Sequence, residues 1–168
     1  MILLPDAFEK NCGGMEINMN IEKVTKDSFC VIGKVGSTNE GEGFVEKLWN
    51  DANSNFNEVS NLAKVNEDGN IVGIWGIMTN FVFDFAPWED NFTKGLYLAG
   101  VEVDENAIAP KGWKKWIVPG FEYLKVYVEG EDTFTKMLSY MKENKIELVG
   151  AVQDYTDPMN NENYMMFP

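Results

Sequence analysis

The 168-residue chain contains no histidine, and its 14 basic side chains are outnumbered by 27 acidic ones, which gives a formal net charge of −13. The missing histidine removes the usual general base and the commonest metal ligand together. Histidine-dependent catalysis is therefore excluded. The glycines also lack the spacing of a Rossmann or Walker phosphate loop, and no cysteine pair has metal-ligand spacing, so we expect no cofactor and no metal.

Cysteines and long apolar runs are also scarce. Cys12 lies in a glycine-rich segment and Cys30 in an apolar run, so these two cysteines do not indicate a disulfide framework. No uncharged stretch reaches the roughly 18 residues that a membrane helix needs. The apolar run at residues 1–5 is shorter than the core of a signal peptide. We therefore expect a cytoplasmic protein with no segment in a membrane.

The shortage of basic residues bears on the choice of partner. A strongly acidic chain repels the phosphate backbone, so direct binding to nucleic acid is not expected. The same charge favours a cationic ligand or a basic protein partner. An acidic surface also keeps a protein in solution without any partner, and the composition alone leaves both interpretations open.

The same succession of elements occurs twice in the sequence. An apolar run at 29–35 leads through Gly36 into an amphipathic segment, and a run at 121–128 leads through Gly130 into another. Each predicted helix is followed by two strand-like runs. Val24 and Val118 are as far apart in the sequence as Gly36 and Gly130. This pattern predicts an α+β fold of two β-α-β-β modules, related by a pseudo-twofold axis with a cleft between them.

Apolar residues recur at spacings of three and four from Val45 to Ala63, which predicts one long amphipathic helix. A second helix is predicted at 131–145. Residues 1–20 show no clear period and are interpreted as a flexible leader or vector remnant, which leaves 21–168 as a single domain. The predicted strands are 29–34, 71–79, 94–103, 113–118, 121–128, 148–155 and 164–167.

Several segments, in one order, resemble the GyrI-like small-molecule-binding domain, which is also the effector-binding domain of AraC-type and MerR-type transcription regulators. The resemblance covers about residues 20–168, and no single motif in it is specific. The segments that carry it are Gly33-Lys34-Val35-Gly36, Leu48-Trp49, the run 95–103, the connection 117–123, Gly150-Ala151-Val152-Gln153-Asp154-Tyr155 and the ending 164–168.

The resemblance implies two SHS2-like modules, an antiparallel sheet with two helices on one face, and a ligand cleft at the pseudo-twofold. In the family this cleft is aromatic, holds a buried acid and receives hydrophobic, often cationic, compounds. Only about 20 residues precede the predicted domain, too few for a helix-turn-helix domain. We therefore expect a stand-alone sensor or sequestering protein.

Strand alternation indicates which side chains lie together in such a site. Tyr123 and Tyr127 share the aromatic face of the run 121–128. Glu102 lies between two valines, so it points either to solvent or into the cleft. Trp75 stands beside Gly76, which leaves room for a ligand against its ring, although a role in the sheet core explains Trp75 equally well.

The resemblance adds three further residues to the candidate site. Asp154 and Tyr155 stand where the family has an acid and an aromatic residue, but Gln153-Asp154 departs from the Glu that often precedes this Tyr. The identity of the pocket acid is therefore open between Glu102 and Asp154. Trp88 could close the cleft as a lid, or it could attach its loop to the sheet.

Binding of small hydrophobic or cationic molecules, without catalysis, is the first functional hypothesis. The second is a hydrolase in which Glu102 or Asp154 acts as general base, assisted by Tyr123 or Tyr155. Without histidine, only an activated or strained substrate is plausible for it. The third is a protein-interaction module of the gyrase-inhibitor kind, in which the acidic surface mimics nucleic acid.

Overall fold

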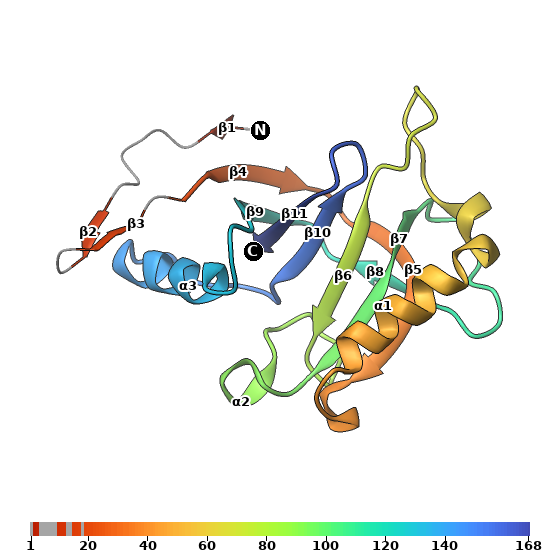
Figure 1. Ribbon diagram of the computed structural model, residues 1–168, viewed down its shortest axis with the longest axis horizontal. Coiled ribbons are helices and arrows are strands. Elements are labelled where there is room, and N and C mark those ends of the chain that lie inside the picture. The colour runs from red at the N-terminus through yellow and green to blue at the C-terminus, as the bar shows by residue number, and fades with distance from the viewer. Residues whose placement is uncertain (1, 4–9, 13–14, 18) are drawn as a thin grey trace.

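The computed structural model describes residues 2–3, 10–12, 15–17 and 19–168. One large antiparallel sheet dominates it, with two long helices over one face (Figure 1). The helices are α1 (Phe44–Ser54), α2 (Glu89–Phe92) and α3 (Thr133–Glu143), with 3-10 turns at Thr38–Glu40, Phe56–Glu58 and Ser60–Leu62. The strands are β1 (Ile2–Leu3), β2 (Lys10–Cys12), β3 (Met15–Ile17), β4 (Ile21–Lys26), β5 (Phe29–Ser37), β6 (Ile74–Thr79), β7 (Leu96–Val103), β8 (Lys114–Val118), β9 (Phe121–Tyr127), β10 (Gln153–Asp157) and β11 (Glu162–Phe167).

The order of strands in the large sheet is β1-β4-β9-β11-β10-β6-β7-β5-β8, while β2 and β3 form a separate pair. The modules β5-α1-β6-β7 and β9-α3-β10-β11 occupy the two halves of this sheet. Each module places its second strand at the centre, where β10 pairs with β6. The prediction of an α+β fold with two β-α-β-β modules is confirmed.

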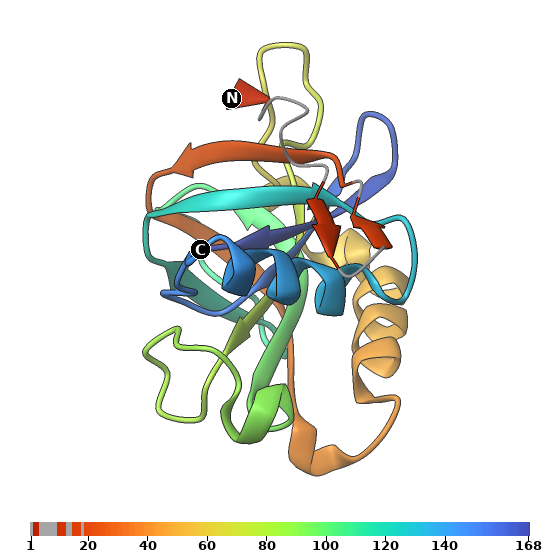
Figure 2. The same cartoon turned by 90° about the vertical axis from the view of Figure 1, so that its left-hand side faces the viewer.

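The strand that precedes each module pairs with the other module. β4 lies before β5 in the chain but pairs with β9, and β8 lies before β9 but pairs with β5. Figure 2 shows β4 and β9 side by side above α3. This exchange joins the two modules at both outer ends of the sheet as well as at the central β6–β10 seam.

The first helix is shorter than predicted. It ends at Ser54, and the chain continues in two 3-10 turns that still bury Val59. The side-chain amide of Asn55 donates to the backbone carbonyl of Asp51 at 3.0 Å and to the Asp51 carboxylate at 2.8 Å. Such bonds from short polar side chains compete with helix continuation. The apolar spacing correctly predicted burial but not a continuous helix.

Strand β4 was not among the predicted strands, because Ile21 and Val24 are its only apolar residues. In the structure it also pairs with β1 from the N-terminal segment. Residues 1, 4–9, 13–14 and 18 of the predicted leader lie outside the described residues. The division of the chain at residue 20 stays a prediction.

The buried side chains of the described residues form three clusters, two beneath the helices and one on the opposite face. We call the face covered by α1 and α3 the helix face and the other the helix-free face. The α1 cluster includes Ile32 and Val101, the α3 cluster includes Val126 and Met137, and the helix-free cluster includes Trp75. Among the described residues, no helix is long and apolar enough to cross a bilayer.

Two glycines allow β5 and β7 to approach closely. Gly33 and Gly100 are register partners, and a Cβ atom on Gly100 would overlap the backbone carbonyl of Ile32. We predict that Gly100→Ala lowers the free energy of unfolding by at least about 2 kcal/mol, because backbone atoms must move to relieve the overlap. Urea unfolding measures this difference. The matched control, Gly130→Ala, meets only an exposed Asp132 oxygen at 3.3 Å and should change stability by less than about 0.5 kcal/mol.

Candidate functional site

The central strands β6 and β10 present different chemistry on their two faces. Neighbouring residues of a strand point to opposite faces, so Asp154 lies on the helix face and Tyr155 on the helix-free face. In the register of the seam, Asp154 is opposite Gly76 and Tyr155 is opposite Trp75. The seam therefore carries one group of residues beneath the helices and another on the far side.

On the helix face, three side chains from three elements form a hydrogen-bonded chain. The Trp49 indole N–H of α1 donates to the Tyr97 hydroxyl of β7 at 3.1 Å. The Tyr97 hydroxyl donates in turn to Asp154 Oδ2 of β10 at 2.9 Å. Gly76 makes this arrangement possible, because a Cβ atom there would overlap the Tyr97 hydroxyl. The acid of one module is thus held by aromatic residues of the other.

Burial shifts the acidity of this pair. It raises the pKa of Asp154 from 3.8 to about 6, against a smaller lowering effect of the Tyr97 hydrogen bond. Burial, together with the charge of Asp154, raises the pKa of Tyr97 well above 10. Tyr97 therefore keeps its proton, while Asp154 carries a negative charge above about pH 6.

Asp154 borders a cavity of about 470 Å³ on the helix face. A second cavity of about 210 Å³ adjoins it, because Met165 lines both and is the register partner of Asp154. We call the two together the inter-helix cleft. Its acidic end is lined by polar and aromatic residues that include Trp49, Asn53, Tyr97, Asp154, Thr156 and Asn163. Its apolar end is lined by Met78, Pro87, Trp88, Phe92, Phe134, Val152 and Met165.

The loop that contains α2 lines the apolar end of the cleft. The Trp88 indole N–H donates to the carbonyl of Leu96 at 2.9 Å, which fixes the loop to β7. Phe92 packs edge-on against Phe134 of α3, with ring centroids 5.2 Å apart. Trp88 thus attaches its loop to the sheet and also lines the cleft, while its role as a lid stays a prediction.

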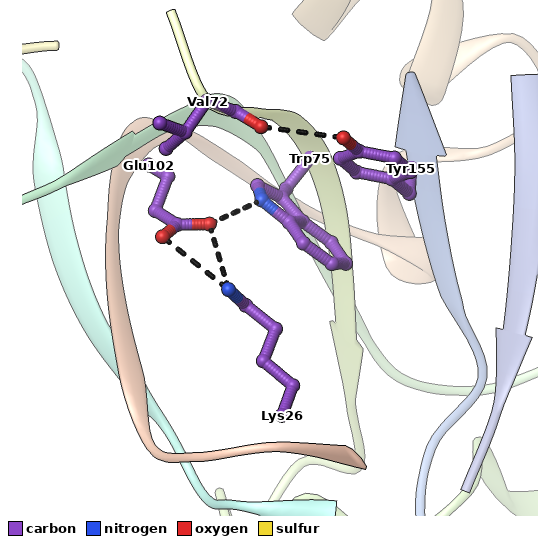
Figure 3. A network of polar contacts seen from close by, with 5 residues as sticks. All are labelled: Lys26, Val72, Trp75, Glu102 and Tyr155. Carbon is purple, nitrogen blue, oxygen red and sulfur yellow. Dashed lines mark hydrogen bonds and ion pairs between the residues drawn. The ribbon is translucent and has the colours of Figure 1, made fainter. Parts of the chain in front are cut away.

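The helix-free face carries the other candidate acid (Figure 3). Glu102 is only 3% exposed, and its Oε1 accepts the Trp75 indole N–H at 3.0 Å. The Lys26 ammonium lies 3.2 Å from the same oxygen and 3.4 Å from Oε2. Next to Trp75, the Tyr155 hydroxyl donates to the carbonyl of Val72 at 3.2 Å. Burial, with smaller contributions from nearby carboxylates, raises the pKa of Tyr155 to about 12.

The predicted site residues therefore divide between the two faces. Asp154 and Trp88 line the inter-helix cleft, and Tyr155 borders it from the seam. Tyr123 is 1% exposed in the helix-free cluster, where its hydroxyl has no hydrogen-bond partner among the residues that the structure describes. Tyr127 lies at the outer part of that face, with its ring 5.8 Å from that of Tyr164. Glu102 and Trp75 lie together on the helix-free face.

Sequence reasoning did not assign Trp49, Tyr97, Phe134 and Met165 to the site. In the sequence, Trp49 falls in the amphipathic run from Val45 to Ala63 and in a segment of the family resemblance, and Tyr97 falls in the predicted strand 94–103. The one available signal was Gly76, a glycine within a predicted strand, which often marks the close approach of another group.

In the part of the chain that the structure describes, no three cysteine, aspartate or glutamate side chains come together as a metal site.

No protein-family model matches the chain, and no curated protein matches its sequence. Among solved structures, the chain is similar to SAV2435 bound to tetraphenylphosphonium, with a TM-score of 0.64 and 12% identity over 89% of this chain and 93% of that one. The two proteins share a fold. An integron cassette protein from the mobile metagenome of Vibrio cholerae is more distant, with a TM-score of 0.49 and 14% identity over 87% of this chain and 92% of that one.

The raised pKa of Asp154 makes a prediction about stability. Between about pH 4 and pH 6 the folded chain binds more protons than the unfolded chain, so stability falls as pH rises through this window and stays lower above it. Asp154→Asn should therefore raise the free energy of unfolding at pH 8 by about 1–3 kcal/mol and have little effect at pH 4. Urea unfolding at both pH values tests this.

The matched control is Asp68→Asn, at an exposed residue of the turn before β6. It should leave the pH dependence of unfolding as it is in the parent chain. An Asp154→Asn chain that is no more stable than the parent at pH 8 would show that the carboxylate is not desolvated.

Proposed function

We propose that this protein binds small hydrophobic cations in the inter-helix cleft, as a relative of GyrI-like effector-binding domains that acts as a sensor or sequestering protein. The observation that carries the proposal is the position of Asp154. Its carboxylate lies at one end of a cleft whose other end is apolar and aromatic.

The two ends of the cleft act on different parts of such a ligand. The Asp154 charge attracts the cation, and an interaction of this kind strengthens as the site excludes water. Aromatic rings beside a cation each contribute about 0.5–2 kcal/mol. The apolar end favours the hydrocarbon part of the ligand, because burying apolar surface contributes roughly 25 cal/mol per Å². Met78 and Met165 are flexible side chains that can adapt to different ligand shapes.

The similarity to SAV2435 supports this proposal, since that protein was solved with a lipophilic cation bound. The contacts in this chain favour binding over the hydrolase hypothesis. Asp154 is paired with Tyr97 and not with Tyr123 or Tyr155, and Glu102 is engaged by Lys26. The hydrolase and gyrase-inhibitor alternatives stay predictions.

Tetraphenylphosphonium should quench the tryptophan fluorescence of the protein saturably, since Trp49 and Trp88 line the cleft. Its affinity should be constant above about pH 7 and should fall as pH decreases through 6, because protonation removes the charge of Asp154. Asp154→Asn should weaken binding by about tenfold at pH 8 and remove the pH dependence. Titrations between about pH 4 and pH 8 measure both effects.

Two controls make this experiment specific. Asp68→Asn, at an exposed turn residue that does not line the cleft, should bind as the parent chain does. Triphenylphosphine oxide, a neutral compound of similar shape, should bind more weakly and without pH dependence. Unsaturable quenching, or an Asp154→Asn chain that binds tetraphenylphosphonium as tightly as the parent, contradicts the proposal.

A further inference from the structure

Glu102 lies on the face of the sheet opposite Asp154 and plays no part in the inter-helix cleft. A buried carboxylate is costly unless it is paired and hydrogen-bonded. Glu102 is 3% exposed, and its partners are the Trp75 indole N–H and the Lys26 ammonium. The chain thus carries a second acidic centre, built for a positive charge.

Aromatic rings complete this centre. The Lys26 ammonium lies 4.5 Å from the centroid of the Phe29 ring and 5.6 Å from that of Trp75, both within the range of cation–π attraction. The two rings are in contact with each other, with centroids 4.7 Å apart. A carboxylate and two ring faces are the groups that would recognise a free organic ammonium ion, and the indole N–H holds the carboxylate in place.

The cation reaches this centre from the surface. Lys26 is the last residue of β4, before the exposed turn residues Asp27 and Ser28, and its side chain is 27% exposed. The aliphatic part of the lysine therefore occupies a path between solvent and Glu102. Figure 3 shows the side chain extending from its strand toward the carboxylate and the indole of Trp75.

We propose that Lys26, Glu102, Trp75 and Phe29 form a second cation site, specific for primary alkylammonium ions, in which Lys26 is a covalently tethered occupant. Removal of the lysine side chain opens the site, and a free alkylammonium ion takes its place. The N–H groups of a primary ammonium are required, because they hydrogen-bond Glu102. This site is independent of the proposed function of the cleft.

Lys26→Ala removes three methylene groups and the ammonium, which n-propylammonium closely reproduces. We expect Lys26→Ala to lower the midpoint of thermal unfolding by roughly 5–10 °C, because Glu102 loses its charged partner. Added n-propylammonium chloride should restore at least half of this loss, with saturation in the millimolar range. The parent chain, whose site is occupied, should show no such increase.

Matched controls separate site binding from general effects. Sodium chloride at equal ionic strength and neutral n-propanol should not restore the midpoint of Lys26→Ala. The double variant Lys26→Ala/Glu102→Gln should not respond to n-propylammonium. If Lys26→Ala does not fold unaided, its refolding yield in n-propylammonium chloride against sodium chloride is the readout.

The proposal is overturned if n-propylammonium restores neither the midpoint nor the refolding yield. It is also overturned if n-propanol or the double variant gives the same response. Lys26→Ala should still bind tetraphenylphosphonium with the pH dependence set by Asp154. The outcome for this site can therefore be distinguished from the outcome for the cleft.

Discussion

The pairing of β6 with β10 is the constraint on which the rest of this structure depends. It joins the two β-α-β-β modules through three register pairs, and the rings of Trp75 and Tyr155 are in contact across it at 4.7 Å. Because the helices of both modules lie on one face of the sheet, this seam lies beneath the space between the two helices. The inter-helix cleft exists because the two helices pack on separate halves of the sheet and not on each other.

Strand alternation places two acidic centres on opposite faces of the sheet, Asp154 on β10 and Glu102 on β7. Asp154 lies beneath the helices, with a hydroxyl partner and an adjoining cavity. Glu102 lies on the far face, held by a lysine of the same chain. The same chemistry, a carboxylate among aromatic rings, thus occurs once beside an open cavity and once with the cation supplied by the chain itself. This difference is why we place ligand binding at Asp154.

The modules and their order were predictable because they depend on local periodicity and on a visible repeat. The aromatic and acidic character of the site was predictable from strand alternation together with the family resemblance. The choice between Glu102 and Asp154 was not, because alternation shows that two residues share a face but not which face the helices cover. The contributions of Trp49 and Tyr97 depend on contacts across 48 and 57 positions of sequence.

The sequence by itself determined the α+β class, the duplicated modules and the absence of histidine chemistry, since each follows from composition or from short-range pattern. Only the tertiary structure decided which acid borders a cavity and which is neutralised. The deciding feature is the pairing of β4 with β9 of the second module. This pairing brings Lys26, the last residue of β4, to Glu102 of the first module. Pairing between strands so distant in sequence is set by the packing of the whole sheet, and no local pattern records it.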